Sequence, residues 1–131
     1  MNDNRSDLRK ILDQWVEGVN GRALDEVGRL YRGSAVLVAT FSETILNTAE
    51  AIGSYFVHIT DGREVQVVVR DGTVLEQMLA GGHQVISGIY DWHIRSDEEE
   101  KNYGARFTFV MDPGSEGPIL HHHSSVLPGE G

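Results

Sequence analysis

The sequence predicts an α+β domain in which N-terminal helices pack on a cone-shaped, curved antiparallel β-sheet. Two observations support this fold class. Up to Asp61 the apolar residues recur mostly at helical spacing, and beyond Gly62 the chain consists of strand-like segments separated by turn residues. Helices followed by a meander of strands are typical of α+β domains with the helices on one face of the sheet. The cone suits a small-molecule site, because such sites are concave and mostly apolar.

Three helices are expected before the meander. The first has Ser6 as its N-cap and stops at Asn20, and the third starts at a capping box of Asn47 and Glu50. The apolar stripe of the first consists of Leu8, Ile11, Leu12, Trp15, Val16 and Val19. The second, shorter helix has on one face Leu24, Val27, Leu30 and Tyr31. The stripe of the third consists of Ile52, Tyr55, Phe56 and Ile59.

The strands are predicted from apolar, partly β-branched runs bounded by turn residues. One strand precedes the third helix, and five follow it; they span residues 35–41, 64–70, 73–78, 83–95, 103–111 and 118–127. Asp71 and Gly72 form a strong hairpin signal between the second and third strands. The acidic run at residues 97–100 and the closing residues 128–131 are expected to be solvated.

Composition narrows the possible functions. The 131 residues include 11 Lys and Arg, 20 Asp and Glu, 6 His and no Cys, which gives a net charge of −9. This length predicts one domain over residues 1–131. The acidic balance argues against nucleic-acid binding, which needs cations to neutralise phosphates. A polar N-terminus and the lack of a long apolar run predict a cytoplasmic protein without membrane contact. Without Cys, only His and oxygen nucleophiles remain as obvious catalytic groups.

The most unusual segment is a run of three histidines and two serines near the C-terminus. Successive side chains on a strand point to opposite faces of the sheet. His121, His123 and Ser125 therefore share one face, and His122 and Ser124 share the other.

Three adjacent imidazoles suggest a zinc site, but the alternation along a strand prevents the run from providing three ligands to one ion. His121 and His123 would form a pair, and a third ligand would have to come from His58, His83 or His93. We therefore expect no metal and no other cofactor. The alternative for His121 and His123 is a hydrogen-bonded role at a subunit interface.

Arg106 is a cation within an otherwise apolar strand. If its side chain points into the cone, it would attract an anion, and it holds its charge at any relevant pH. The alternative is an exposed arginine paired with an acid such as Asp91. Thr40 and Tyr55 are each, by default, residues at the edge of the core. A polar patch in an apolar cone would then consist of Thr40, Tyr55, Arg106, His122 and Ser124.

Several segments give the chain a resemblance to a known family. They lie at residues 36–42, 52–56, 87–90, 105–110 and, most specifically, 121–128. On these segments the chain resembles the association-domain-like branch of the nuclear transport factor two superfamily. That branch is related to SnoaL-like proteins and to the hub domain of calmodulin-dependent kinase II. The histidine-serine ending is similar to that of iota-class carbonic anhydrases, some of which work without a metal.

The resemblance implies a pocket for carbon dioxide and bicarbonate inside the cone, and a homodimer or larger homo-oligomer. The positions that match the family's catalytic groups are Thr40, Tyr55, His122 and Ser124. The positions expected to bind substrate are Arg106, Tyr90, His123 and Ser125. Two departures from the family pattern are noted. The segment 112–118 lacks a Trp that relatives often have, and Trp92 stands where Phe is usual.

The expected reaction is metal-free hydration of carbon dioxide. The hydroxyls of Thr40, Tyr55 and Ser124 would position water and the carbonate oxygens. His122 would shuttle the proton, since an unperturbed imidazole pKa of roughly 6.5 suits that task. Arg106 would make the pocket favourable for bicarbonate in a net acidic protein.

Two other functions remain open. The first is a non-catalytic domain that binds a small carboxylate in the cone and self-associates, as hub domains do. The second is an isomerase or cyclase of the SnoaL type, which would need a carboxylate base deep in the cone. Asp91 is the leading candidate for that base, but it follows no clear site pattern.

Overall fold

The structure is a computed structural model that describes residues 5–129. Residues 1–4 and 130–131 lie outside this range, so the expectations for the polar N-terminus and the closing segment fall partly there. The helices are α1 (Asp7–Asn20), α2 (Leu24–Leu30) and α3 (Ala49–Thr60), with short 3-10 turns η1 (Asp71–Thr73) and η2 (Ala80–Gly82). The strands are β1 (Tyr31–Val38), β2 (Glu64–Val69), β3 (Leu75–Met78), β4 (Gln84–Ser96), β5 (Glu99–Met111) and β6 (Ile119–Val126).

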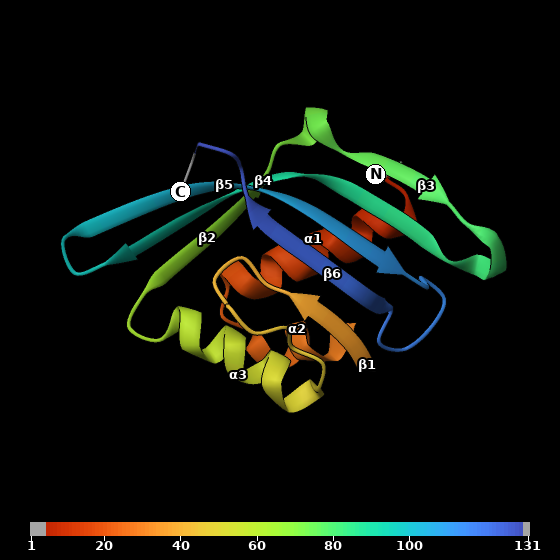
Figure 1. Cartoon of the computed structure of the whole chain (residues 1–131), viewed down its shortest axis with the longest axis horizontal. Helices are drawn as coiled ribbons and strands as arrows, with labels where there is room; N and C mark the ends of the chain where they lie inside the picture. The colour runs from red at the N-terminus through yellow and green to blue at the C-terminus, as the bar shows by residue number, and fades with distance from the viewer. Residues whose placement is uncertain (1–4, 130–131) are drawn as a thin grey trace.

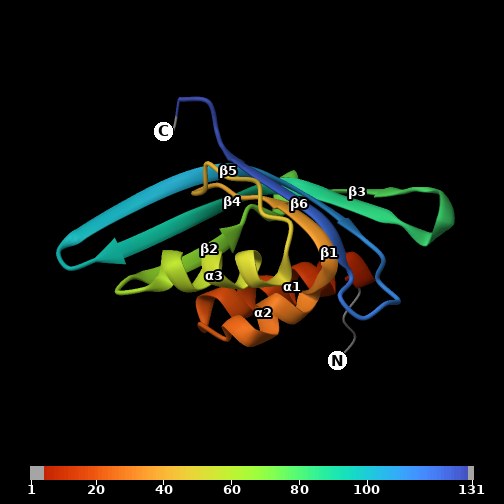
Figure 2. The same ribbon diagram turned by 60° about the horizontal axis from the view of Figure 1, so that its bottom comes forward.

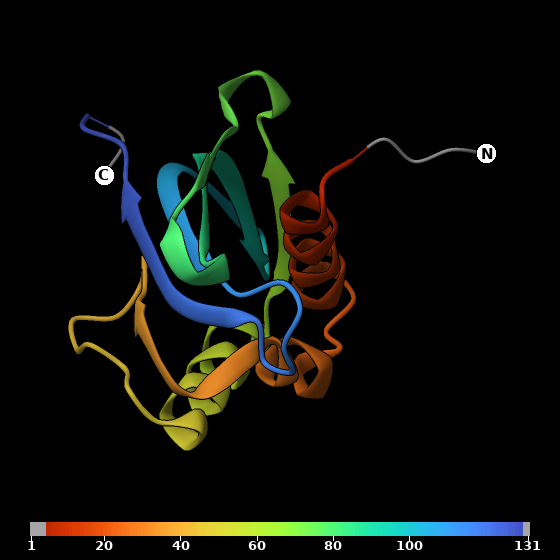
Figure 3. The same ribbon diagram turned by 90° about the vertical axis from the view of Figure 1, so that its right-hand side faces the viewer.

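The strands form one curled sheet in the order β1-β6-β5-β4-β2, with β3 also paired to β4. The helices lie against the concave face of this sheet (Figure 2). In the part of the chain described here, β1 and β2 end the strand order and do not pair with each other, so the sheet curls without closing (Figure 3). The predicted α+β cone is thereby confirmed, with one addition: β1 runs parallel to β6, while the other pairs are antiparallel.

The hairpin predicted at Asp71 and Gly72 is wrong. These two residues lie in η1, and the strands on either side of it do not pair with each other. Instead, β2 pairs with residues 90–95 of β4, and β3 pairs with residues 84–87 of the same strand. The chain therefore pairs with β4 twice, once before and once after the short turn η1. This is possible because β4 is long enough to pair with two short strands in succession.

Two predicted element boundaries also need correction. Tyr31, expected on the second helix, is the first residue of β1. The N-cap of α3 is Thr48 and not Asn47, because the Thr48 hydroxyl accepts a hydrogen bond of 3.0 Å from the Ala51 backbone N–H. The acidic run is exposed as predicted, but its last two residues begin β5.

The core lies between the helices and the concave face of the sheet, and Trp15 is at its centre. The Trp15 side chain is fully buried, and its indole contacts rings from α3, β4, β5 and β6. The predicted stripes of α1 and α3 are buried as expected, with Val16 only partly covered. None of the helices that the structure describes has the length and apolar character of a membrane span.

We expect Gly18→Ala to destabilise the contact between α1 and α2. A Cβ at residue 18 would lie 2.6 Å from Val27 Cγ2, so either the Val27 side chain or one of the two helices must shift. The expected loss in the free energy of unfolding is about 1–3 kcal/mol, measured by urea denaturation. Gly53→Ala in α3 is the matched control, because a Cβ there meets nothing within 4 Å. It should increase stability by about 0.5–1 kcal/mol. Equal effects of the two substitutions would contradict the close packing at Gly18.

Candidate functional site

A small cavity, here called the inner cavity, lies between Trp15 and the concave face of the sheet. The volume of this cavity is about 10 Å³, which is roughly enough for one water molecule. Its lining consists of Trp15, Leu37, Ala39, Thr40, Tyr55, Phe56, Tyr90, Trp92, His122 and Ser124. The structure therefore brings together the four residues expected to be catalytic, along with Tyr90. These residues come from α3, β4, β6 and the segment that follows β1.

His122 is the central polar residue of this site. Its ring is 2% exposed and stacks on Phe109 with a centroid separation of 3.8 Å. Nδ1 lies 2.8 Å from the Tyr31 hydroxyl, and Nε2 lies 3.1 Å from the Tyr90 hydroxyl. Both ring nitrogens therefore have a tyrosine partner inside the core.

The proton positions around His122 follow from the donors available. Trp15 Nε1 can only donate, and it donates to the Tyr31 oxygen at 3.0 Å. The proton of Tyr31 then needs another acceptor, and among the described residues this is His122 Nδ1. His122 Nε2 consequently bears the imidazole proton and donates to the Tyr90 oxygen.

The same series of hydrogen bonds continues to the hydroxyls of the cavity. Burial raises the pKa of Tyr90, and a hydrogen bond with Ser124 and a weaker interaction with Thr40 oppose this effect. The hydroxyls of Thr40 and Ser124 are hydrogen-bonded to each other. A buried hydrogen-bond chain thus runs from Trp15 through Tyr31, His122 and Tyr90 to these two residues.

The site is polar but uncharged. Burial lowers the pKa of His122 well below its usual range, and the neighbouring imidazoles of His121 and His123 add to this effect. Burial also raises the pKa of the Tyr31 and Tyr55 hydroxyls. The described lining contains no carboxylate. The expected proton shuttle at His122 therefore needs revision, because this imidazole stays neutral at physiological pH.

We expect the neutral state of His122 to be visible in the pH dependence of the protein. Its pKa is lower in the folded than in the unfolded chain, so below about pH 6.5 the unfolded chain binds more protons. Stability should be highest above that pH and decrease as the pH falls, by at most about 1.4 kcal/mol per pH unit from this group. Imidazole NMR signals of His122 should stay constant between about pH 8 and about pH 5.5. A His122 titration near pH 6.5 in the folded protein would contradict the burial and bonding described.

Trp92 adds one unsatisfied donor to the inner cavity. Its side chain is 2% exposed, and Nε1 is buried with no acceptor at full hydrogen-bond geometry in the described residues. A weak interaction of this N–H with the Tyr90 hydroxyl lowers the pKa of Tyr90 slightly, so the donor is incompletely satisfied. An indole N–H can only donate, and a buried donor without an acceptor is costly. The cavity is therefore suited to a guest that supplies an oxygen acceptor.

The other residues expected to bind substrate lie away from the inner cavity. Arg106 and His123 are exposed, and Ser125 is partly buried opposite Arg106 in the β5–β6 pairing. The cause is the alternation of the strands: the neighbours Phe107 and Ser124 point inward, so these three side chains belong to the outer face.

The predicted alternation of the histidine run is confirmed, but the expectation that Arg106 lies inside the cone is wrong. The suggested partner Asp91 instead forms an ion pair with Arg70, at 2.7 and 2.9 Å. Among the described residues, no set of three His, Asp or Glu side chains is arranged to hold a metal ion.

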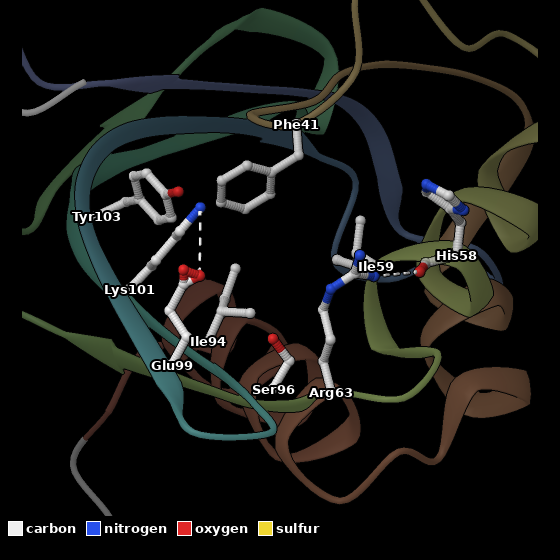
Figure 4. A pocket seen from close by; sticks show the side chains of 9 residues that line it. All are labelled: Phe41, His58, Ile59, Arg63, Ile94, Ser96, Glu99, Lys101 and Tyr103. Carbon is white, nitrogen blue, oxygen red and sulfur yellow. Dashed lines mark hydrogen bonds and ion pairs between the residues drawn. The ribbon is translucent and has the colours of Figure 1, made fainter.

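A second hollow, here called the outer pocket, lies between α3 and the projecting β4–β5 hairpin (Figure 4). Its volume is about 310 Å³, and its lining consists of Phe41, His58, Ile59, Arg63, Ile94, Ser96, Glu99, Lys101 and Tyr103. Phe41 separates it from the inner cavity, because its ring also packs edge-on against Trp92 with a centroid separation of 5.4 Å. The Phe41 backbone N–H donates to the Tyr55 hydroxyl at 3.3 Å, which holds this segment against α3.

Comparisons with known proteins establish the fold. No model of a known protein family matches the sequence, and no curated protein does. A solved structure from Xanthomonas campestris, assigned as a calcium/calmodulin-dependent protein kinase II association domain, superposes with a TM-score of 0.83 at 23% identity. The match covers 98% of this chain and 91% of the other. This is the nuclear transport factor two-like cone fold.

Other solved structures, one of them an enzyme, share this cone. An epoxide hydrolase of the LEH-like type from M. tuberculosis superposes with a TM-score of 0.72 at 6% identity, covering 95% of this chain and 85% of the other. ActVI-ORFA from Streptomyces coelicolor has a TM-score of 0.74 at 8% identity, with 92% and 94% covered. At these identities the likeness is one of fold, and the cone supports unrelated functions.

Proposed function

We propose that the inner cavity catalyses the hydration of carbon dioxide without a metal, as the resemblance to iota-class carbonic anhydrases implies. The observation that supports this most is the convergence of neutral donors on a space of about one water. The hydroxyls of Thr40, Ser124, Tyr55 and Tyr90 and the incompletely satisfied Trp92 N–H all belong to the lining. Carbon dioxide is apolar, so an aromatic cavity with a few donors suits it chemically. Because the space has room for about one water, the side chains of the lining must move apart to admit carbon dioxide beside the attacking water.

The uncharged lining favours a mechanism that creates no ion in the cavity. Water held by Thr40 attacks the carbon of carbon dioxide and passes a proton to the Thr40 oxygen. Thr40 passes its own proton to Ser124, with which it is hydrogen-bonded, and Ser124 donates its proton to a carbon dioxide oxygen. One C–O bond and one O–H bond form, while one water O–H bond and the π bond of one C=O group of carbon dioxide break, so carbonic acid is the product. It ionises to bicarbonate after release.

In this mechanism His122 is a positioning residue. Its Nε2–H holds the Tyr90 oxygen, and Tyr90 in turn interacts with Ser124. An imidazolium at this depth would be destabilised by burial, as the lowered pKa of His122 indicates. Trp92 Nε1–H would stabilise the oxygen on which negative charge grows in the transition state, because a preorganised donor acts strongly in a dry site.

The test is stopped-flow hydration of carbon dioxide with chelator-treated protein. We expect a rate above that of buffer that is unchanged by the chelator and by Arg106→Ala, since Arg106 lies on the outer face. Absence of activity would refute the proposal. Loss of activity on chelation, with recovery on adding zinc, would refute its metal-free form.

A second candidate is a non-catalytic binding and self-association domain. Two observations favour it: the described lining of the inner cavity lacks a group that titrates near neutral pH, and the Xanthomonas structure is an assigned association domain. Light scattering would then give the mass of a dimer or a larger ring, without turnover of carbon dioxide. A homo-oligomer, a cytoplasmic location and the absence of nucleic-acid or membrane partners stay predictions.

A further inference from the structure

The outer pocket differs from the inner cavity in both size and charge. Its volume of about 310 Å³ is within the range of small-molecule sites, whereas the inner cavity has room for about one water. It opens between two separate parts of the chain (Figure 4). Lys101 and Glu99 extend from the β5 wall, and His58 and Arg63 lie on the wall formed by α3 and the turn before β2.

The positive charges in the outer pocket are only partly balanced by the single carboxylate of its described lining, so the pocket can accept an anion. Arg63 is half-buried and donates one hydrogen bond of 3.1 Å, from Nη1 to the His58 carbonyl. In the described part of the chain no carboxylate lies within 4.0 Å of this guanidinium, which has five N–H donors in total. Lys101 Nζ is 3.9 Å from Glu99 Oε1, and both side chains are more than 60% exposed. That pair is weak, and two cations face one carboxylate.

Between the two cations the pocket is apolar and aromatic. Phe41 and Tyr103 pack edge-to-face with a centroid separation of 5.3 Å. Ile94 completes this surface, and Ile59 adds only a small part of its side chain, since its exposed fraction is 5%. A simple inorganic anion would use the cations and leave Phe41, Tyr103 and Ile94 uncovered. An anion with an apolar body would contact both the two cations and the apolar side chains.

We propose that the outer pocket binds an organic monocarboxylate with an aromatic body. The carboxylate lies between Arg63 and Lys101, and the ring packs on Phe41, Tyr103 and the neighbouring isoleucines. This site is independent of carbon dioxide hydration, because among the described residues the two linings have no residue in common, and Phe41 of the outer pocket only packs against Trp92 of the inner cavity.

The test uses phenylacetate as the probe and phenylacetamide as its neutral isostere, with titration calorimetry at low ionic strength. We expect the amide to bind at least tenfold more weakly, and phenylacetate affinity to fall as salt is added. Arg63→Gln and Lys101→Gln should each weaken phenylacetate at least fivefold. Arg95→Gln is the matched control, because Arg95 is an exposed arginine on the same hairpin that pairs with Glu64 outside this pocket. It should change the affinity by less than about twofold.

Backbone NMR on the wild-type protein locates the bound probe. Shifts should concentrate at Phe41, Ser96 and Lys101. Equal affinity of acid and amide, an undiminished affinity in both Gln variants, or shifts that avoid these residues would overturn the proposal. Activity of the inner cavity is measured separately on carbon dioxide, so failure of one proposal does not decide the other.

Discussion

Replacing His122 with phenylalanine is expected to lower the free energy of unfolding by about 2–6 kcal/mol. Phenylalanine keeps an aromatic ring to stack on Phe109, but it is larger than histidine, so overpacking adds to the loss. Each of two buried hydroxyls also loses one hydrogen-bond partner: among the described residues, Tyr31 keeps only its contact with Trp15, and Tyr90 keeps only those with its cavity neighbours. Each buried polar group left unsatisfied costs about 1–3 kcal/mol.

The matched control for this substitution is His123→Phe on the same strand. His123 is exposed on the outer face, so its replacement should change stability by no more than about 0.5 kcal/mol. Urea denaturation of both variants and of the wild type is measured at about pH 7.5. At this pH, His122 of the wild type is neutral in both the folded and the unfolded chain. A loss below about 1 kcal/mol for His122→Phe, or equal losses for the two variants, would contradict the buried hydrogen-bond chain.

The second large effect is expected on catalysis. Ser124→Ala should lower kcat/KM for carbon dioxide hydration by about 10²–10³-fold, because it removes the hydroxyl that donates to the carbon dioxide oxygen and interacts with Thr40. Thr40→Val should have a similar effect, since it removes the acceptor of the water proton. Stopped-flow measurements with folded variants test this.

Ser125→Ala is the matched control for catalysis. Ser125 is adjacent in sequence but belongs to the outer face, so its replacement should leave the hydration rate within about twofold of wild type. If both serine variants keep the wild-type rate, the hydroxyl relay is wrong. If both lose activity equally, the inner cavity is not where the reaction occurs.

Much of the inner cavity could be predicted from the sequence because its residues follow local periodicities. Helical spacing put Trp15 and Tyr55 on buried faces, and both line the cavity. Strand alternation separated His122 and Ser124 from their neighbours, and these two are buried on the inner side. Thr40 has no periodic signal of its own, so the residues suggest only a place in the polar patch, and its catalytic role is what the resemblance implies.

Other features depend on tertiary structure and have no local signal. The outward position of Arg106 depends on which face of β5 the helices cover, and alternation alone leaves that choice open. The outer pocket joins Arg63 and Lys101, which are far apart in sequence and meet only because the β4–β5 hairpin projects over α3. The periodicity of the sequence predicts Tyr31 on a helix, so its hydrogen bond to His122 has no signal in the sequence. Complete burial lowers the pKa of His122, which supports the proposed role of a positioning residue over that of a shuttle.

The most direct test of the inner cavity as a carbon dioxide site is a crystal structure of bicarbonate-soaked protein with anomalous data. We predict that the inner cavity takes up carbonic acid, the neutral acid of bicarbonate, which accepts a hydrogen bond from Trp92 Nε1 and contacts the hydroxyls of Thr40 and Ser124, with no anomalous peak beside it. An inner cavity that stays empty of carbonic acid at a saturating bicarbonate concentration, or a metal ion bound at the reacting groups, would contradict the account.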